Sequence, residues 1–233
     1  MSGANKSLYD WISSDKVDRF VIVLPHLNSN QDFSKLANCK VVTGNYFCLH
    51  HDLGSKPLIY WIKKYLKTVY MVLFEKIIKK RLEKIVLENN SDLIISNSFS
   101  VIYGAITAKK VNLPHFWHIR EFMELDHQIS HKNPILIKDL AAYSNAIFIS
   151  DVVEEYYRGK YGFKNSTIIY TQIKIDKNFS YDKQLFTNDI IHIFMSGTLQ
   201  ENKGSKEAIS AVLTFLNKGI AVLFDISGYG PQN

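Results

Sequence analysis

The sequence predicts an α/β protein built on a parallel β-sheet, followed by a second, smaller α/β unit. Three observations lead to this fold class. Short, continuous apolar runs alternate with helical segments along most of the 233 residues. Such runs are typical of parallel strands that are covered on both faces. Hydrophobic residues make up 46% of the chain and charged residues 21%, which excludes a disordered chain.

The elements of the first unit follow one another in chain order. Apolar runs predict strands at residues 20–25, 40–43, 92–97, 115–119, 146–150 and 167–170. The segments between them predict a long helix over 56–88 and shorter helices over 101–110, 134–143 and 152–161. This alternation of strand and helix is the signature of a sheet whose strands are joined by helical crossovers.

A second alternation begins after a polar, poorly periodic stretch, residues 165–189, which is typical of a linker. It consists of a strand at 190–195, a helix at 205–217 and a strand at 221–226. Two strands and one helix bury too little surface to form a stable core. We therefore expect an N-terminal domain over 1–175 and the first part of a second domain over 176–233.

Polar residues stand where the predicted strands end. Ser96–Ser98 and Ser150–Asp151 do so, as do His118, Arg120 and Glu121 after the strand at 115–119. Parallel sheets bind ligands at the carboxyl ends of their strands. The cluster of His118, Arg120 and Glu121 is therefore a candidate ligand site. The alternative is an ion pair between Arg120 and Glu121 that braces the loop.

A glycine and a lysine connect the strand at 190–195 to the helix at 205–217. Gly197 would let the backbone approach a phosphate, and Lys203 would add a positive charge beside the free N–H groups of the helix N-terminus. Many turns between a strand and a helix contain these residues for structural reasons alone. A phosphate site and an ordinary turn both remain open.

Three segments, taken together, resemble the family 4 glycosyltransferases of bacterial polysaccharide biosynthesis. The second unit contributes residues 194–204 and 226–230, with the glycines Gly197, Gly204, Gly228 and Gly230. The first unit contributes Phe-Trp-His-Ile-Arg-Glu-Phe at 116–122 and the Gly-Ala-Asn-Lys-Ser-Leu start at 3–8. The segments occur in the family's order, and the resemblance covers nearly the whole chain.

The resemblance implies the GT-B arrangement of two Rossmann-like domains. It also implies retaining, metal-independent transfer of a hexose from a nucleotide-sugar to a polysaccharide or lipid-linked acceptor, with no cofactor and no nucleic acid partner. By position, it assigns the donor diphosphate to Gly3, Ala4, Gly197 and Lys203, the catalytic place beside the transferred sugar to His118, and the acceptor side to Arg120 and Glu121. Fixed positive groups facing the diphosphate would stabilise the charge that develops on it.

The sequence also departs from this family. Thr198 stands where many members have a basic residue, and the family's first strand does not precede Gly3. The family's paired glutamates, which hold the donor sugar and ribose, would come after residue 233. We therefore expect a fragment that is inactive by itself. The alternative, from a different functional class, is a non-catalytic binding module docked on a membrane.

The segment Lys56–Arg81 combines lysines with aromatic residues, and the chain carries a net charge of +6. Basic helices of this kind bind anionic membranes, and a solvated helix face gives the same pattern. A cytoplasmic protein bound peripherally at the inner face of the plasma membrane is the expectation. The N-terminus has no signal sequence, and no apolar run is long enough to cross a bilayer.

Histidines and cysteines give weaker signals. His50–Asp52, His127 and His131 lack a convincing third metal ligand, and a position at the surface is the expectation for them. Cys39 and Cys48 match no zinc or redox spacing, which predicts reduced thiols. The sequence also lacks an Asp-x-Asp pair of the kind that holds the metal in the other main glycosyltransferase fold.

Overall fold

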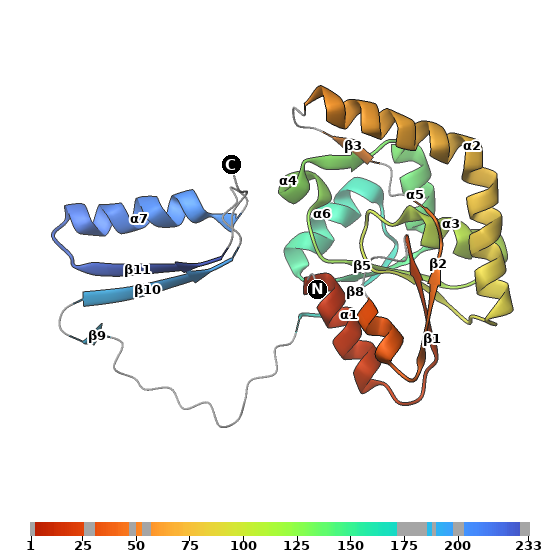
Figure 1. Ribbon diagram of the computed structural model, residues 1–233, viewed down its shortest axis with the longest axis horizontal. Coiled ribbons are helices and arrows are strands. Elements are labelled where there is room, and N and C mark those ends of the chain that lie inside the picture. Colours follow the sequence, from red (N-terminus) through yellow and green to blue (C-terminus); the bar gives the residue numbers. More distant parts are fainter. Residues whose placement is uncertain are drawn as a thin grey trace. The chain divides into compact units, whose positions relative to one another are not determined.

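A computed structural model describes residues 3–25, 31–46, 50–52, 57–171, 186–187, 190–197 and 203–228. The chain divides into two compact units, Met1–Thr171 and Gln172–Asn233 (Figure 1). Every strand and helix predicted from the apolar runs is present, with ends that differ by at most two residues.

The first unit contains a four-stranded parallel sheet in the order β4-β5-β7-β8. Its strands are β4 (Ile94–Ser96), β5 (His115–Ile119), β7 (Asn145–Phe148) and β8 (Asn165–Ile168). The crossovers contain α3 (Ile102–Val111), α5 (Pro134–Tyr143) and α6 (Asp151–Tyr161). The α/β prediction with a parallel sheet is confirmed. The prediction that the linker starts at residue 165 is wrong, because residues 165–168 pair with β7.

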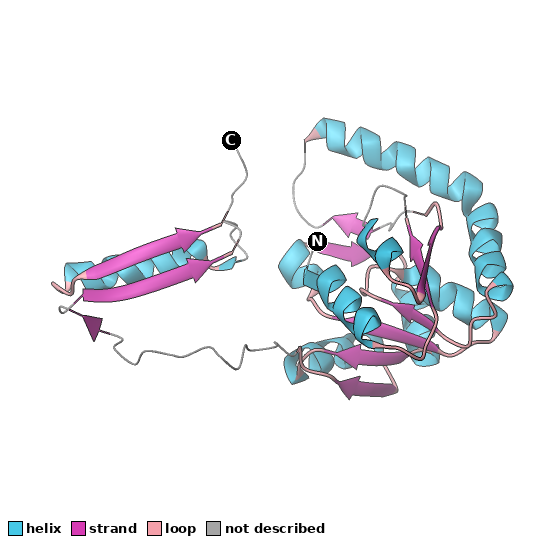
Figure 2. Ribbon diagram, turned by 60° about the horizontal axis from the view of Figure 1, so that its bottom comes forward, coloured by secondary structure: helices cyan, strands magenta, loops and turns pink. Residues whose placement is uncertain are grey.

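Helices α3, α5 and α6 cover one face of this sheet (Figure 2). Trp117 and Ile119 of β5 point into that core, where Phe99 contacts the rings of Trp117 and Tyr157. The other face carries Phe116 and His118, which are only half-buried. The prediction of two covered faces is therefore met on one side only, within the residues described.

Local signals place the helices of this core. Asn133 caps α5 by accepting a hydrogen bond from the N–H of Leu136, and Pro134 occupies the first turn, where its missing N–H costs nothing. Ser150 caps α6 in the same way, through the N–H of Val153. Asn112 ends α3 in the left-handed conformation that asparagine tolerates well.

A separate, two-stranded parallel sheet joins β1 (Phe20–Leu24) to β2 (Cys39–Thr43). Helix α1 (Gly3–Ser14) precedes it, and the 3-10 helix η1 (Gln31–Lys35) lies between its strands. The short strands β3 (His50–Asp52) and β6 (Ile129–His131) pair antiparallel, and α4 (Met123–His127) leads into β6. Patterns of alternating apolar residues did not predict β3, β6 or α4, because each is at most five residues long.

Helix α2 (Leu58–Glu88) bends near its middle, as Figure 1 shows by the change of direction between its orange and yellow parts. The second half packs Ile78 and Leu82 against Tyr46 and Tyr103. The first half has no such cover. Its apolar residues Leu58, Ile62, Tyr65, Leu66, Val72 and Leu73 are between 51% and 76% exposed.

The second unit consists of β9 (Phe186–Thr187), β10 (Ile190–Ser196), α7 (Ser205–Asn217) and β11 (Val222–Ser227). Strands β10 and β11 are parallel, and β9 pairs antiparallel with β10. Of its described hydrophobic residues only Val212 is buried, whereas Phe194 is 69% exposed. The unit thus leaves much of its apolar surface open, which agrees with the expectation that so few elements cannot bury a core.

Candidate functional site

The candidate site lies at the carboxyl end of β5, where the strand passes into the loop that leads to α4. Burial alternates along β5, with His115, Trp117 and Ile119 buried and Phe116 and His118 half-buried. Side chains of a strand alternate between the two faces of its sheet. His118 is therefore presented on the less covered face, away from the aromatic core.

Arg120 follows the strand and is half-buried. Its Nη2 donates a weak, 3.4 Å hydrogen bond to Oγ1 of Thr171. Its Nη1 is buried and has no hydrogen-bond partner among the residues that the structure describes. Buried donors are nearly always paired in folded proteins, and a guanidinium has no neutral form to fall back on. An unpaired donor of this kind is expected where a ligand supplies the acceptor.

Glu121 makes a different contact. Its Oε1 accepts a hydrogen bond of 2.7 Å from Oγ of Ser98, which follows β4. Ser98 is fixed in turn, because its carbonyl accepts a hydrogen bond from Nε1 of the buried Trp117. No ion pair links Arg120 to Glu121 within the described chain. The alternative of a loop braced by that pair is therefore not what the structure has.

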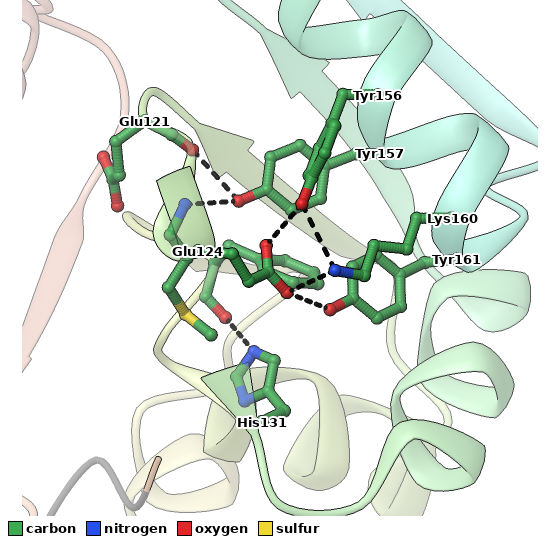
Figure 3. Close-up of polar contacts among 9 residues, drawn as sticks. Glu121, Glu124, His131, Tyr156, Tyr157, Lys160 and Tyr161 are labelled. Carbon is green, nitrogen blue, oxygen red and sulfur yellow. Dashed lines mark hydrogen bonds and ion pairs between the residues drawn. The ribbon is translucent and has the colours of Figure 1, made fainter. Parts of the chain in front are cut away.

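Tyr157 of α6 holds the backbone of this loop. Its hydroxyl donates to the carbonyl of Glu121 at 3.0 Å and accepts from the N–H of Met123 at 2.9 Å (Figure 3). The side chain is fully buried, and burial raises its pKa above the usual range, so it stays protonated. One buried hydroxyl thus fixes both sides of the turn after Arg120.

Glu124, in the first turn of α4, anchors the loop to α6. Its carboxylate accepts hydrogen bonds from Tyr156 at 3.0 Å, Lys160 at 2.9 Å and Tyr161 at 2.7 Å (Figure 3). Burial by itself would raise the pKa of Glu124, but the bonds from Tyr161 and Lys160 outweigh it and lower the pKa. Glu124 is an ionised, fully engaged group that positions the loop. The residues after 122 gave no sequence signal for this role.

His118 stands beside the charge of Arg120, and its ring forms no hydrogen bond with another residue that the structure describes. Burial, followed by repulsion from the Arg120 guanidinium, lowers the pKa of His118 to about 4. The imidazole is therefore neutral near pH 7. A neutral imidazole offers one N–H donor and one lone pair, so it suits hydrogen bonding to hydroxyl groups better than charge pairing.

The polar residues at the end of β4 do not all reach the site. Ser96, expected at the ligand edge, is buried and bonds to Nε2 of His115 at 3.0 Å. Nδ1 of His115 meets Oγ of Ser144 at 2.7 Å, and that hydroxyl donates to the carbonyl of Leu140. Since the Ser144 proton is used, Nδ1–H must donate and Nε2 must accept. The Ser-His-Ser chain is a satisfied core network and offers no accessible nucleophile.

The residues expected at the donor diphosphate fall in both units. Gly3 and Ala4 form the first turn of α1. Gly197 follows β10, where its N–H donates to the carbonyl of Ser227 at 3.0 Å, and Gly228 packs against its backbone. Lys203 is exposed just before Gly204, the N-cap of α7. Gly197 thus stands at the end of β10 and Lys203 directly before the N-cap of α7, whereas Thr198 lies outside the described residues.

The histidines discussed as metal ligands give no cluster. His131, expected at the surface, is buried, and its Nε2 meets the carbonyl of Phe99 at 2.9 Å. The side chains of His50–Asp52 lie outside what the structure describes. Over the described ranges, no three His, Cys, Asp or Glu side chains gather into a possible metal site.

Comparisons of the chain with protein-family models, with curated proteins and with solved structures gave no match. Across the described helices, none is both long and apolar enough to cross a membrane. The site is defined by its own geometry: at the carboxyl edge of a parallel sheet lie a guanidinium whose buried Nη1 has no partner among the described residues, a neutral imidazole and a fixed carboxylate.

Proposed function

We propose that the chain is part of a GT-B glycosyltransferase that transfers a hexose from a nucleotide-sugar to a polysaccharide or lipid-linked acceptor. The observation that carries the proposal is the buried Nη1 of Arg120, which has no partner within the described chain and stands at the edge where parallel sheets bind ligands. Both ligands of such a reaction carry phosphate or hydroxyl oxygens. A planar guanidinium suits the phosphate oxygens.

The neighbouring groups would make the remaining contacts with the donor and the acceptor. His118, neutral near pH 7, would hydrogen-bond hydroxyl groups of the sugar. The second carboxylate oxygen of Glu121 would accept a hydrogen bond from a hydroxyl group of the acceptor substrate. In the second unit, Gly197 and Lys203 at the start of α7 would meet the donor diphosphate, because a helix N-terminus and a lysine both favour negative charge. Gly3 and Ala4 would do so from α1.

The first experiment measures ligand binding to the 233-residue chain by saturation-transfer NMR. The ligands are a panel of UDP-, GDP-, ADP- and dTDP-sugars and a soluble glycan phosphate. We expect at least one phosphate-bearing ligand to bind, and Arg120→Leu to weaken it about 10-fold or more, the effect of a lost charge-assisted hydrogen bond. Arg19→Leu is the matched control, because Arg19 is exposed and lies far from Arg120 in the sequence.

Two results would count against this function. One is that no ligand of the panel binds to the folded wild-type chain. The other is that Arg120→Leu and Arg19→Leu bind equally well, which would remove the guanidinium from the site. Circular dichroism and thermal melting of both variants show whether the fold is intact.

A second candidate function, a binding module docked on an anionic membrane, is favoured by the first half of α2. Leu58, Ile62, Tyr65, Val69 and Val72 recur every three or four residues and would form one apolar stripe. Lysines lie on the other side of this half at positions 63, 64 and 67, and further lysines follow at 76, 79 and 80. An exposed apolar stripe beside lysines is the pattern of a helix that lies in a bilayer surface.

The lysines of α2, among them Lys63, Lys64, Lys67, Lys79 and Lys80, do not share one helix face. Lys63 and Lys79 are 16 residues apart, which turns a regular helix by about 160°. The apolar stripe would therefore insert into the bilayer surface, and the lysines of the opposite face would stay in the water near the anionic headgroups. Membrane contact through Lys56–Arg81 would thus depend mainly on the apolar side chains of the first half of α2.

Co-sedimentation with vesicles tests the membrane proposal at low and high salt. Replacing Ile62 and Tyr65 of the stripe by serine should release the protein from phosphatidylserine vesicles, because the apolar contact is lost. Ile135→Ser with Val152→Ser is the control, since both side chains are exposed apolar residues on other helices. Equal binding by the two double variants, or no binding by the wild type, would make this half of α2 a plain solvated face.

A further inference from the structure

A cavity of about 440 Å³ lies in the first unit between β1 and β4. Its walls include the consecutive residues 21–25 on one side and 93–97 on the other. Successive side chains of a strand point to opposite faces of its sheet, so consecutive residues line a cavity together only where the strand turns its backbone edge toward it. The cavity is thus a slot between two strand edges, called the strand slot below.

On the side that faces the slot, the backbone N–H and C=O groups of both strands lack a partner strand among the residues that the structure describes. Within the described chain, β1 pairs only with β2, and β4 pairs only with β5. The rest of the lining is mainly apolar and includes Leu8, Phe33, Leu82 and Ile85. An unpaired strand edge beside apolar side chains is a template for another strand, because it offers both backbone hydrogen bonds and hydrophobic contact.

The two edges run in the same direction. At the amino ends, Nζ of Lys40 in β2 donates to Oδ1 of Asn89, five residues before β4, at 2.8 Å. At the carboxyl ends, Tyr46, three residues after β2, packs against the ring of Tyr103, which follows β4. Since β1 is parallel to β2, a strand in the slot could be parallel to both neighbours at once.

Helix α1 is placed to continue from such a strand. The carbonyl oxygens of Ile12 and Asp15, at its C-terminal end, accept hydrogen bonds from Nδ2 of Asn38, directly before β2. The C-terminal end of α1 therefore lies at the amino ends of the strands. Its N-terminal turns, from which Asn5 lines the slot, lie toward the carboxyl ends. A parallel strand would end where α1 begins.

We infer that the strand slot is the place of one further β-strand, apolar on both faces, parallel to β1 and β4 and joined to the N-terminal end of α1. It would turn the two separate sheets into one continuous parallel sheet in the order β2-β1-new strand-β4-β5-β7-β8. Five residues span about 16 Å, which matches the length of β1. A short turn is enough to reach α1, as is common between a strand and a helix.

The test adds this strand to the full chain. Five alternating valine and isoleucine residues and a short Gly-Ser turn are placed ahead of Met1. One control has proline as the middle residue of the strand, which removes a ladder N–H while keeping the apolar character. A second control is a Gly-Ser extension of the same length. All are compared as isolated monomers by thermal melting and by amide hydrogen exchange.

The proposal expects the apolar extension to raise Tm by about 5 °C or more over both controls, a shift typical of a few added buried residues in a chain of this size. Amide protection should rise at Val23 in β1 and at Ile95 in β4, whose N–H groups face the slot, and not in α7. Equal Tm values for the three extensions would overturn it. The same gain from the free peptide added in trans would overturn the link to α1 and assign the slot to a strand of a partner.

Discussion

His115 and His118 stand three residues apart on one strand and have the same perturbed titration. Burial lowers the pKa of each to about 4. Yet His115 points into the aromatic core and bonds to Ser96 and Ser144, whereas His118 lies half-buried on the other face beside Arg120. A strongly shifted pKa therefore does not distinguish a structural histidine from a candidate site residue. The difference lies in whether the ring nitrogens are already satisfied by the protein.

The pH dependence of stability should show what the two histidines have in common. Each is neutral in the folded chain and gains a proton below about pH 6.5 when unfolded. Their stabilising effect is full above that pH and is lost as the pH falls toward 4. The slope should be about 1.4 kcal/mol per pH unit for each histidine. Urea unfolding between pH 7 and pH 4.5 measures it.

A variant sharpens this result. His118→Gln should remove about half of the histidine contribution to the slope while the chain stays folded at pH 7. Titration of the two imidazoles by NMR gives the same information directly. A midpoint for His118 near 6.5 would show that its side chain is solvated and would break the comparison.

The substitution His115→Ala should separate the two histidines by stability. It leaves the buried hydroxyl of Ser96 without its acceptor and also opens a cavity. The expected loss in the free energy of unfolding is about 3 kcal/mol. His118→Ala should cost less than about 1 kcal/mol, because its ring is half-buried and bonds to no described side chain. Similar losses in chemical denaturation would contradict the assignment of His115 to the core and His118 to the site.

Tyr157→Phe tests whether the loop of the site depends on the core side of the sheet. The variant keeps the ring but removes the hydroxyl that serves Glu121 and Met123, and we expect a loss of about 2 kcal/mol because a buried N–H is left unpaired. Tyr170→Phe is the control, since that exposed hydroxyl donates to Asp151 and to no other residue that the structure describes. Ligand binding should weaken in the first variant and not in the second. If neither variant changes stability, the loop is held by other contacts.

The smallest effect is expected for ligand affinity in His118→Ala. Loss of one hydrogen bond to a sugar hydroxyl should weaken binding about 10-fold, with Tm nearly unchanged. The measurement is the NMR binding assay with the ligand that the wild type selects. His115→Ala, studied below its own melting temperature, should bind with wild-type affinity. The reverse order of affinities would move the site to the opposite face of the sheet.

Most strands and helices of this fold could be predicted from the sequence, whereas few of its polar side-chain contacts could. Long apolar runs and their spacing predicted the strands of the parallel sheet and helices such as 134–143, because burial dictates those residue types. The place of Arg120 and His118 at the strand end followed from the same pattern. The partners of Glu124 and the burial of Ser96 could not be predicted, because these contacts join residues that are far apart in the chain. Single polar residues carry no periodic signal.

The three tryptophans lie in different environments, so intrinsic fluorescence can report on different parts of the chain. Trp117 is fully buried in the core, Trp61 is 39% exposed on the first half of α2, and Trp11 is 44% exposed on α1, where its ring contacts Phe20. Their emission colours should differ accordingly, with Trp117 blue and protected from acrylamide. Membrane docking would shift Trp61 alone, and unfolding of the sheet would shift Trp117. Tryptophan emission, measured without an attached dye, would thus report separately on the core and on helix α2.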